Sequence, residues 1–166
     1  MIWYYAFLSQ SWSDYQVFQE LNESRHPNCH KLHYLQMATE KLGKAGLMEI
    51  TGNSPPKMKH DAFVCFLRHT KVHPFWKKRL GFAQNKRGYA AYIDGMLPIA
   101  DKIEKLAPAI SGPSQPNPEY PWSPRPGDVT CPADYDFPEI KRHELGKITA
   151  LISNLFRALD VEPEKD

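Results

Sequence analysis

The sequence predicts an all-α protein: a helical bundle of about five helices, with a long proline-rich loop before the last helix. Apolar residues recur at three- and four-residue steps over most of the chain, as on the buried face of a helix. No alternation typical of a strand extends beyond a few residues. A chain of 166 residues, 42% of them hydrophobic, builds one core, so residues 1–166 are expected to form a single domain.

Two long helices are predicted at the start, over about 2–22 and 28–49. The first stops before Pro27, because the residue preceding a proline disfavours helical backbone angles. The second ends near Gly52, since glycine commonly follows the last helical turn. The connection between them is short, so we expect an antiparallel hairpin.

Three further helical runs follow. A third helix is predicted over about 61–72 and ends at Pro74. The next run, about 83–107, contains Pro98, which removes a hydrogen bond and collides with the preceding turn. That element is therefore expected to be kinked or divided in two. The last helix, about 138–159, has leucine and isoleucine at alternating four- and three-residue steps, which is typical of a packing seam.

The segment 108–138 is the proline-rich loop and holds nine of the 15 prolines. It shows no periodicity, yet it contains large apolar side chains that a free linker lacks. We expect it to lie against the bundle. These side chains are Tyr120, Trp122, Val129, Tyr135 and Phe137.

Membrane and secretory segments are not visible in the sequence. No run approaches the roughly 20 apolar residues that span a bilayer, and the aromatic start lacks a basic leader. Three widely spaced cysteines fit free thiols in a reducing compartment better than a disulfide framework. A cytoplasmic protein without a membrane partner is expected.

Positive charge is concentrated in one segment, Lys57 to Arg87, which holds nine Lys or Arg residues and a single acid, Asp61. Such a segment suits nucleic-acid phosphates or an acidic protein surface, although a solvated helix face is equally consistent with it. Phe75, Trp76 and Phe82 lie among these cations and either stack on bases or anchor the segment to the core. The predicted nucleic-acid-binding residues are Lys71, Lys77, Lys78, Arg79, Lys86 and Arg87.

The stretch SDYQVFQELN followed by HKLHYLQMATEKLGKAGL resembles the HEPN superfamily of small helical bundles. Members of that family have a helix that reads roughly Q-x-A-x-E-K-x-x-K-A. Here the matching residues are Gln36, Ala38, Glu40, Lys41, Lys44 and Ala45, with Asp14 and Tyr15 upstream. His60 and Asp61 match the His-Asp pair that opens the family's third helix, and NPEYP at 117–121 is similar to its Tyr-Pro element.

The resemblance implies a HEPN-like bundle with an RNA- or nucleotide-associated role of toxin-antitoxin or defence type. It also implies a homodimer and, in some members, a nucleotidyltransferase-type antitoxin partner. Many members are metal-independent ribonucleases, whereas others are binding modules, and fold alone does not choose between them. The sequence therefore predicts an RNA- or nucleotide-binding module that uses residues 57–87. The alternatives are a metal-independent endoribonuclease and a non-catalytic protein-interaction adaptor.

The ribonuclease branch of the family uses an arginine followed four to six residues later by a histidine. Two matches occur: Arg68 with His73, and Arg25 with His30. Imidazole exchanges protons with a ribose hydroxyl near neutral pH, and guanidinium binds the phosphate. The first pair is the better candidate because it lies in the basic segment. Residues five positions apart do not lie on the same face of a helix, however, so Arg68 and His73 converge only if the chain turns at Pro74.

Cofactor and metal sites are not expected. The chain has no glycine-rich phosphate loop. His26, Cys29, His30 and His33 resemble a zinc cluster, but no Cys-x-x-Cys pair completes it. Gln36, Glu40 and Lys44 share one stripe, which is interpreted as an exposed Glu-Lys pair or, alternatively, as a polar seam facing a dimer partner or a nucleotide.

Overall fold

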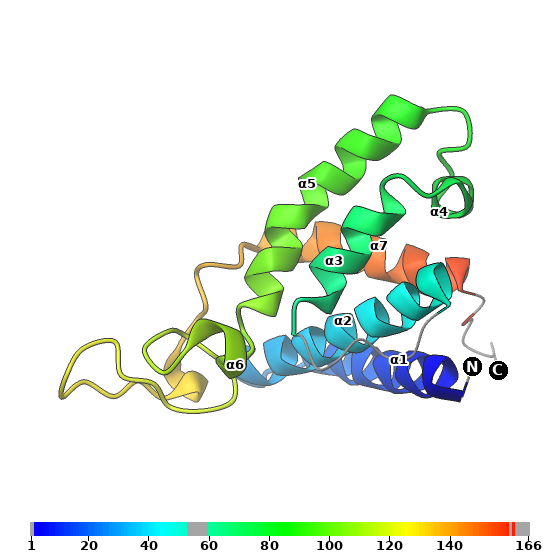
Figure 1. The fold of residues 1–166 in the computed structure, drawn as a ribbon. Coiled ribbons are helices and arrows are strands. Elements are labelled where there is room, and N and C mark those ends of the chain that lie inside the picture. The colour runs from blue at the N-terminus through cyan, green and yellow to red at the C-terminus, as the bar shows by residue number, and fades with distance from the viewer. Residues whose placement is uncertain (1, 53–59, 160, 162–166) are drawn as a thin grey trace.

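A computed structural model describes residues 2–52, 60–159 and 161. Within these residues the secondary structure is helical, and a single isolated bridge between Trp122 and Thr130 is the only strand-like pairing. The helices are α1 (Ile2–Asn22), α2 (Asn28–Thr51), α3 (Ala62–Thr70), α4 (Pro74–Arg79), α5 (Lys86–Glu104), α6 (Pro108–Ser111) and α7 (Arg142–Ala158), with a 3₁₀ turn at Pro132–Asp134 (Figure 1).

The predicted all-α class is confirmed, but the helix count of about five is too low. Seven α-helices occur in the described residues. The two that the sequence did not predict, α4 and α6, are only 6 and 4 residues long. Segments this short carry too little apolar periodicity to be detected in a sequence. The five long elements lie where the periodicity predicts them, with ends shifted by a few residues.

The helix α5 is continuous through Pro98, so it is not divided in two. Pro98 has no amide hydrogen, so the Asp94 carbonyl lacks its usual hydrogen-bond donor in the helix. Both residues are exposed. Water can therefore satisfy that carbonyl, and the proline ring is accommodated on the outer side of the helix.

The hairpin of α1 and α2 forms the base of the bundle, and the two helices run antiparallel along each other (Figure 1). Leu8, Tyr15 and Phe18 of α1 face Leu35 and Leu42 of α2 in one hydrophobic core. The Ser11 hydroxyl donates to the Ala38 carbonyl at 2.7 Å across this contact. The predicted hairpin is thus present.

The helix α3 lies unusually close to α2 because two glycines face it. A Cβ atom on Gly43 would lie 2.5 Å from the backbone nitrogen of Phe63. A Cβ atom on Gly46 would lie 2.3 Å from the Phe66 ring. Both distances are shorter than any real carbon contact, so only glycine permits this approach.

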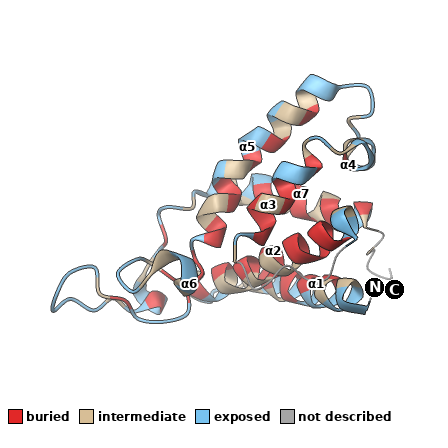
Figure 2. Ribbon diagram, in the orientation of Figure 1, coloured by how far each residue is buried: buried red, intermediate tan, exposed pale blue. Residues whose placement is uncertain are grey.

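The helices α5 and α7 close the core. Ile93 and Ile103 of α5 and Ile148, Ile152 and Leu155 of α7 are completely buried. Buried surfaces of the long helices face one another in Figure 2, whereas Lys86 and Arg87 at the start of α5 are exposed. The packing seam predicted for the last helix therefore faces the interior.

Part of the proline-rich segment packs on the bundle through Trp122 and Phe137, which belong to the hydrophobic core cluster, whereas most of residues 119–131 are exposed. The rings of Trp122, Tyr135 and Phe137 contact one another at centroid distances of 5.0 to 6.2 Å, and Trp122 and Phe137 are buried. The Asn117 side-chain oxygen accepts hydrogen bonds from the backbone of Glu119 and Tyr120. This closes a tight turn in the NPEYP stretch.

None of the described helices combines the length and the apolar character that crossing a bilayer requires.

Candidate nucleic-acid interface

The end of α3, the helix α4 and the start of α5 surround an open cleft of about 380 Å³. Its cationic and imidazole side chains come from three elements. We call it the Lys71–Lys86 cleft; its lining residues are Lys71, Val72, His73, Pro74, Lys77, Lys86 and Ala90.

Local packing fixes the two walls of this cleft. The Tyr89 hydroxyl of α5 donates to the Thr70 carbonyl at the end of α3, at 3.0 Å. Trp76 anchors α4, since its buried ring meets Phe66 of α3 edge-on at 5.1 Å. Proline starts α4 readily because it supplies a preset backbone angle and needs no amide donor there. These contacts hold Lys71 and Lys77 at the cleft.

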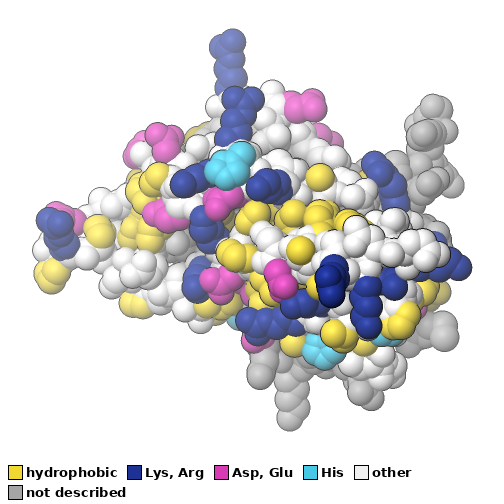
Figure 3. Space-filling model, turned by 90° about the horizontal axis from the view of Figure 1, so that it is seen from above, with side chains coloured by type: hydrophobic (Ala, Val, Ile, Leu, Met, Phe, Trp, Pro, Cys, Tyr) yellow, Lys and Arg dark blue, Asp and Glu magenta, His cyan; other side chains and the backbone are white. Residues whose placement is uncertain are grey.

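The first turn of α5 presents Lys86 and Arg87. Asn85 caps this helix, and its side-chain oxygen accepts the Gly88 amide at 2.8 Å. Both basic residues are exposed. Viewed from above, dark blue side chains gather over the end of the molecule where α4 and the start of α5 lie (Figure 3).

The predicted basic residues differ in what they contact. Lys71 forms an ion pair with Asp94 at 2.7 Å. Arg79 lies over the Phe75 ring, 5.2 Å from its centroid. Lys78 is exposed. Lys57 and Lys59, which begin the basic segment, lie outside the described residues.

Of Phe75, Trp76 and Phe82, the three rings expected either to stack on bases or to anchor the segment, only Phe75 is exposed enough for stacking. Trp76 is completely buried, and Phe82 packs against Tyr89 and Tyr92. Phe75 is 38% exposed. The sequence could not separate these roles, because the three rings have similar neighbours along the chain.

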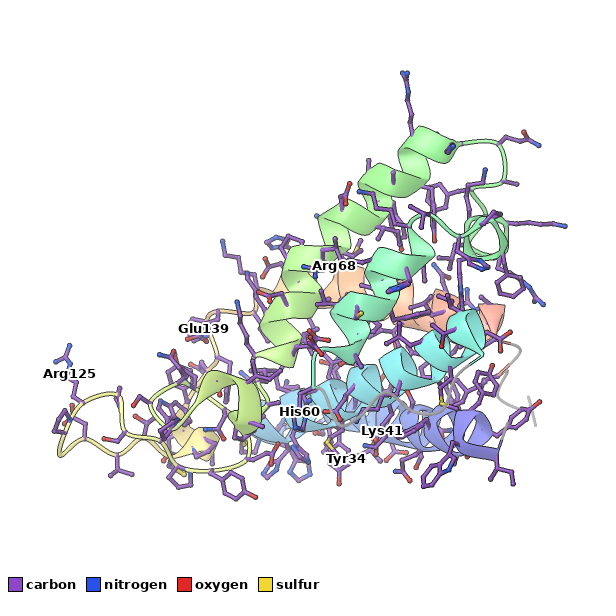
Figure 4. All side chains as sticks on the ribbon, in the orientation of Figure 1. Tyr34, Lys41, His60, Arg68, Arg125 and Glu139 are labelled. Carbon is purple, nitrogen blue, oxygen red and sulfur yellow. The ribbon has the colours of Figure 1, made fainter. Side chains whose placement is uncertain are left out.

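The structure does not bring Arg68 and His73 together. Arg68 is exposed on α3, and its side chain is not part of the cleft lining (Figure 4). His73 precedes α4 and lines the cleft. No hydrogen bond or ion pair joins these two described residues, and no described residue is a hydrogen-bond partner of the buried His73 Nδ1 atom.

No hydrogen bond or ion pair joins the described residues Arg25 and His30. Arg25 lies in the turn between α1 and α2, and His30 is in the first turn of α2; both are exposed. The His30 ring instead meets His26 edge-on at 6.2 Å. Neither residue lines the Lys71–Lys86 cleft.

The stripe on α2 proves to be buried, so its interpretation as an exposed pair is wrong. Gln36 and Lys44 are only 2% and 7% exposed. Glu40 lies between them and accepts hydrogen bonds from the Gln36 amide at 3.1 Å, from Lys44 at 2.5 Å and from the His60 ring at 2.9 Å. An i,i+4 Glu-Lys pair has the same sequence pattern whether it faces water or protein, which is why the sequence misplaced it.

Electrostatics keep Glu40 ionised in this network. Burial raises the pKa of Glu40, but hydrogen bonds from Lys44 and His60, together with the Lys44 charge, outweigh burial and lower it below its ordinary value. The neighbouring Lys41 pairs with Asp14 of α1 at 2.7 Å. The Glu40 network and the Lys41 pair therefore tie α2 to α3 and α1 through balanced charges.

Glu104 is a buried titratable group that the sequence does not reveal. It is 4% exposed at the end of α5, and its carboxylate accepts the Val64 amide in the first turn of α3 at 2.9 Å. Burial raises the pKa of Glu104 to about 7, with smaller contributions from Asp61 and Asp101 and an opposing effect of the amide hydrogen bonds. In the sequence this residue resembles any other helical glutamate.

The possible zinc cluster is not assembled. Cys29 is buried, whereas His26 and His30 are exposed, and His33 lies 3.6 Å from the Glu119 carboxylate. Within residues 2–52, 60–159 and 161, no group of three or more metal-binding side chains is close enough to hold an ion.

No protein-family model, curated protein or solved structure matches this chain.

Proposed function

We propose that this chain is a HEPN-like helical module that binds RNA in the Lys71–Lys86 cleft. One observation carries the proposal: three elements bring Lys71, Lys77, Lys86 and His73 to a single open cleft. The antiparallel α1–α2 pair and the position of His60 and Asp61 directly before α3 support the HEPN-like part.

The charges in the cleft favour a polyanion. Among the described residues no carboxylate forms an ion pair with Lys77 or Lys86. The Lys71–Asp94 pair is solvent-exposed and contributes only about 0–1 kcal/mol, so a phosphate can compete for Lys71. Lysine binds phosphate as a point charge at any orientation, which suits a flexible backbone.

The apolar surroundings favour RNA over an acidic peptide. Val72, on the cleft wall, is 82% exposed, and the neighbouring Phe75 ring carries the Arg79 guanidinium on one face. Unpaired bases stack on aromatic rings and on guanidinium planes, whereas glutamate and aspartate side chains do not. Cations beside such surfaces are typical of single-stranded RNA interfaces.

The test is a binding titration with a labelled single-stranded RNA of about 12 nucleotides, a length that covers a typical single-strand site. We expect affinity to fall steeply with salt. Because each phosphate contact contributes about 0.7 to the slope of log K against log salt, the variant K77A/K86A should lower the slope by about 1.4. Arg125→Ala is the matched control, since Arg125 is exposed at the far end of the proline-rich segment (Figure 4).

Equal affinity and equal salt slope in K77A/K86A and R125A would contradict the proposal. Binding of polyglutamate in place of RNA would favour the adaptor alternative.

A second candidate is metal-independent RNA cleavage, which is favoured by the position of His73 in the cleft. Arg68 does not line it, so the Arg68–His73 pair remains a prediction. Cleavage in the presence of EDTA that is lost in H73A and in R68A would support that pair, and cleavage unchanged in both would exclude it. The homodimer and the nucleotidyltransferase-type partner belong to the same proposal. The molecular mass of the protein in solution, compared with that of one chain, tests whether it is a homodimer.

A further inference from the structure

Two of the three cysteines lie on elements that pack against each other. Cys29 is the second residue of α2, and Cys131 directly precedes the 3₁₀ turn Pro132–Asp134, which packs on α2 (Figure 1). The third cysteine, Cys65, lies on α3. Cys29 and Cys131 are distant in the sequence, so only the fold brings them to the same contact.

The backbone on either side of Cys131 is held in place. Thr130, which precedes it, exchanges two backbone hydrogen bonds with Trp122, at 2.9 and 3.2 Å. On the other side Pro132 is buried, and the Asp134 amide donates to the Cys131 carbonyl at 3.1 Å. Cys131 itself is exposed. Its thiol therefore reaches solvent from a defined position.

A side-chain hydrogen bond joins the same segment to the start of α2. The Asn28 side-chain amide donates to the Asp136 carbonyl at 3.2 Å. Asn28 immediately precedes Cys29, and Asp136 lies shortly after the 3₁₀ turn that Cys131 begins. The two thiols are close enough to interact electrostatically. Packing, hydrogen bonding and electrostatics thus agree that Cys29 and Cys131 are neighbours.

The two thiols differ in their access to an oxidant. Cys29 is only 3% exposed, whereas Cys131 is exposed. Burial raises the pKa of the Cys29 thiol, and the nearby Cys131 thiol adds to this rise. The backbone amides of His30 and Cys29 bond to the Cys29 sulfur and act in the opposite sense. An oxidant in solution therefore meets Cys131 first, while Cys29 is protected until a disulfide forms beside it.

We infer that Cys131 and Cys29 form an intramolecular disulfide when the chain meets an oxidised thiol such as glutathione disulfide. The Cys131 thiolate attacks one sulfur of the oxidant, forms a mixed disulfide and releases one glutathione. The Cys29 thiol then loses its proton and attacks the Cys131 sulfur, and the second glutathione leaves as a thiolate that takes up a proton. Two protein thiols are oxidised to one disulfide, and one glutathione disulfide is reduced to two thiols.

The inference does not depend on the proposed function, because neither cysteine lines the Lys71–Lys86 cleft. An exposed thiol beside a second thiol that resolves it is the arrangement of redox-sensing cysteines. The disulfide joins the proline-rich segment covalently to α2 and closes a long loop of the chain. Because this restricts the unfolded chain, oxidation should raise the Tm by roughly 5–10 °C.

The test is oxidation of the full native chain by glutathione disulfide, followed by alkylation of the remaining thiols in denaturant and peptide mass spectrometry. We expect Cys65 to be alkylated and the peptides of Cys29 and Cys131 to be joined to each other. The intact chain should lose the mass of two hydrogen atoms. Dithiothreitol should restore three free thiols and the lower Tm.

Two variants identify the thiols. Cys131→Ser replaces an exposed side chain, so the variant is expected to fold. Its Cys29 should stay reduced in the same oxidant, and its Tm should not rise. Cys65→Ser is the matched control, because it removes the third cysteine, which is partly exposed on α3. This variant should form the disulfide as readily as the native chain.

Three free thiols after oxidation would overturn the inference, and so would glutathione retained on Cys131 beside a reduced Cys29. Pairing through Cys65, or a disulfide between two chains, would overturn it as well. A Tm that does not rise after the disulfide has formed would show that the bond forms only by distorting the fold, which also contradicts the inference.

Discussion

Glu104 shows how one buried carboxyl group couples the structure to pH. It accepts a backbone amide of α3 from the end of α5 while Asp61 and Asp101 lie nearby, and burial raises its pKa to about 7. The folded chain therefore holds this proton more tightly than the unfolded chain does. For such a group the free energy of unfolding falls as pH rises from about 4.5 to about 7, and is constant above.

Glu104→Gln should remove this dependence. The loss of stability between pH 5 and pH 8 should be smaller in the variant by about 2.5 kcal/mol, which is the part of the effect of a pKa shift from 4.5 to about 7 that falls in this pH range. Urea unfolding at the two pH values measures it. An identical pH dependence in both proteins would show that Glu104 does not titrate in this range.

The Glu40–Lys44 pair allows a matched comparison with the Lys105–Asp101 pair, which has the same spacing on another helix. Glu40 and Lys44 have side chains 12% and 8% exposed, whereas those of Lys105 and Asp101 are 61% and 50% exposed. Lys44→Met should lower the free energy of unfolding by about 2–3 kcal/mol, because it leaves a buried carboxylate without its cation. Lys105→Met should change it by less than about 0.5 kcal/mol. Equal effects in urea titrations would contradict the burial of Glu40.

At the scale of single residues, the sequence predicts chemistry but not burial. It identifies Gln36, Glu40 and Lys44 as one stripe and Lys77 and Lys86 as cations, and the structure agrees on both. It does not reveal that the stripe is covered or that Glu104 caps α3, because these facts depend on which helices meet. Arg68 and His73 illustrate the same limit, since their spacing along the chain does not determine whether their side chains converge.

At the scale of elements, the glycines of α2 have opposite roles to the glycine of α7. Gly43→Ala should destabilise the protein by about 1–3 kcal/mol, since the added methyl group meets the α3 backbone. Gly146→Ala should stabilise it by about 0.5–1 kcal/mol, because nothing lies within 4 Å of the added atom and alanine favours the helix. Thermal unfolding separates the two, and a stable Gly43→Ala variant would show that α3 does not approach α2 so closely.

Helix positions were predictable where an apolar periodicity is followed by a proline or glycine that ends the helix, as for α1 and α2. They were also predictable where the periodicity is long and regular, as for α7. The prediction failed at α4, which is 6 residues long and is held by a single buried ring, Trp76. It also left open whether the helix is kinked or divided at Pro98, because a sequence does not show that the proline faces water. Long-range contacts decide both cases.

At the scale of the whole molecule, the proline-rich segment is expected to unfold together with the bundle. Trp122 is buried in the aromatic group that holds this segment, so Trp122→Ala should lower the free energy of unfolding by about 3–5 kcal/mol. Calorimetry should still show one transition at a lower Tm. A second, separate transition would mean that the segment and the bundle are independent.

The close approach of α3 to α2 also has an effect at the far end of α3. That helix carries Lys71 directly after its last residue, so its tilt sets the position of one wall of the Lys71–Lys86 cleft. An alanine at Gly46 would push the Phe66 ring, and with it the neighbouring Trp76 and α4, outward from the bundle. The spacing between Lys71 and Lys77 thus depends on the absence of a side chain at Gly46 of α2.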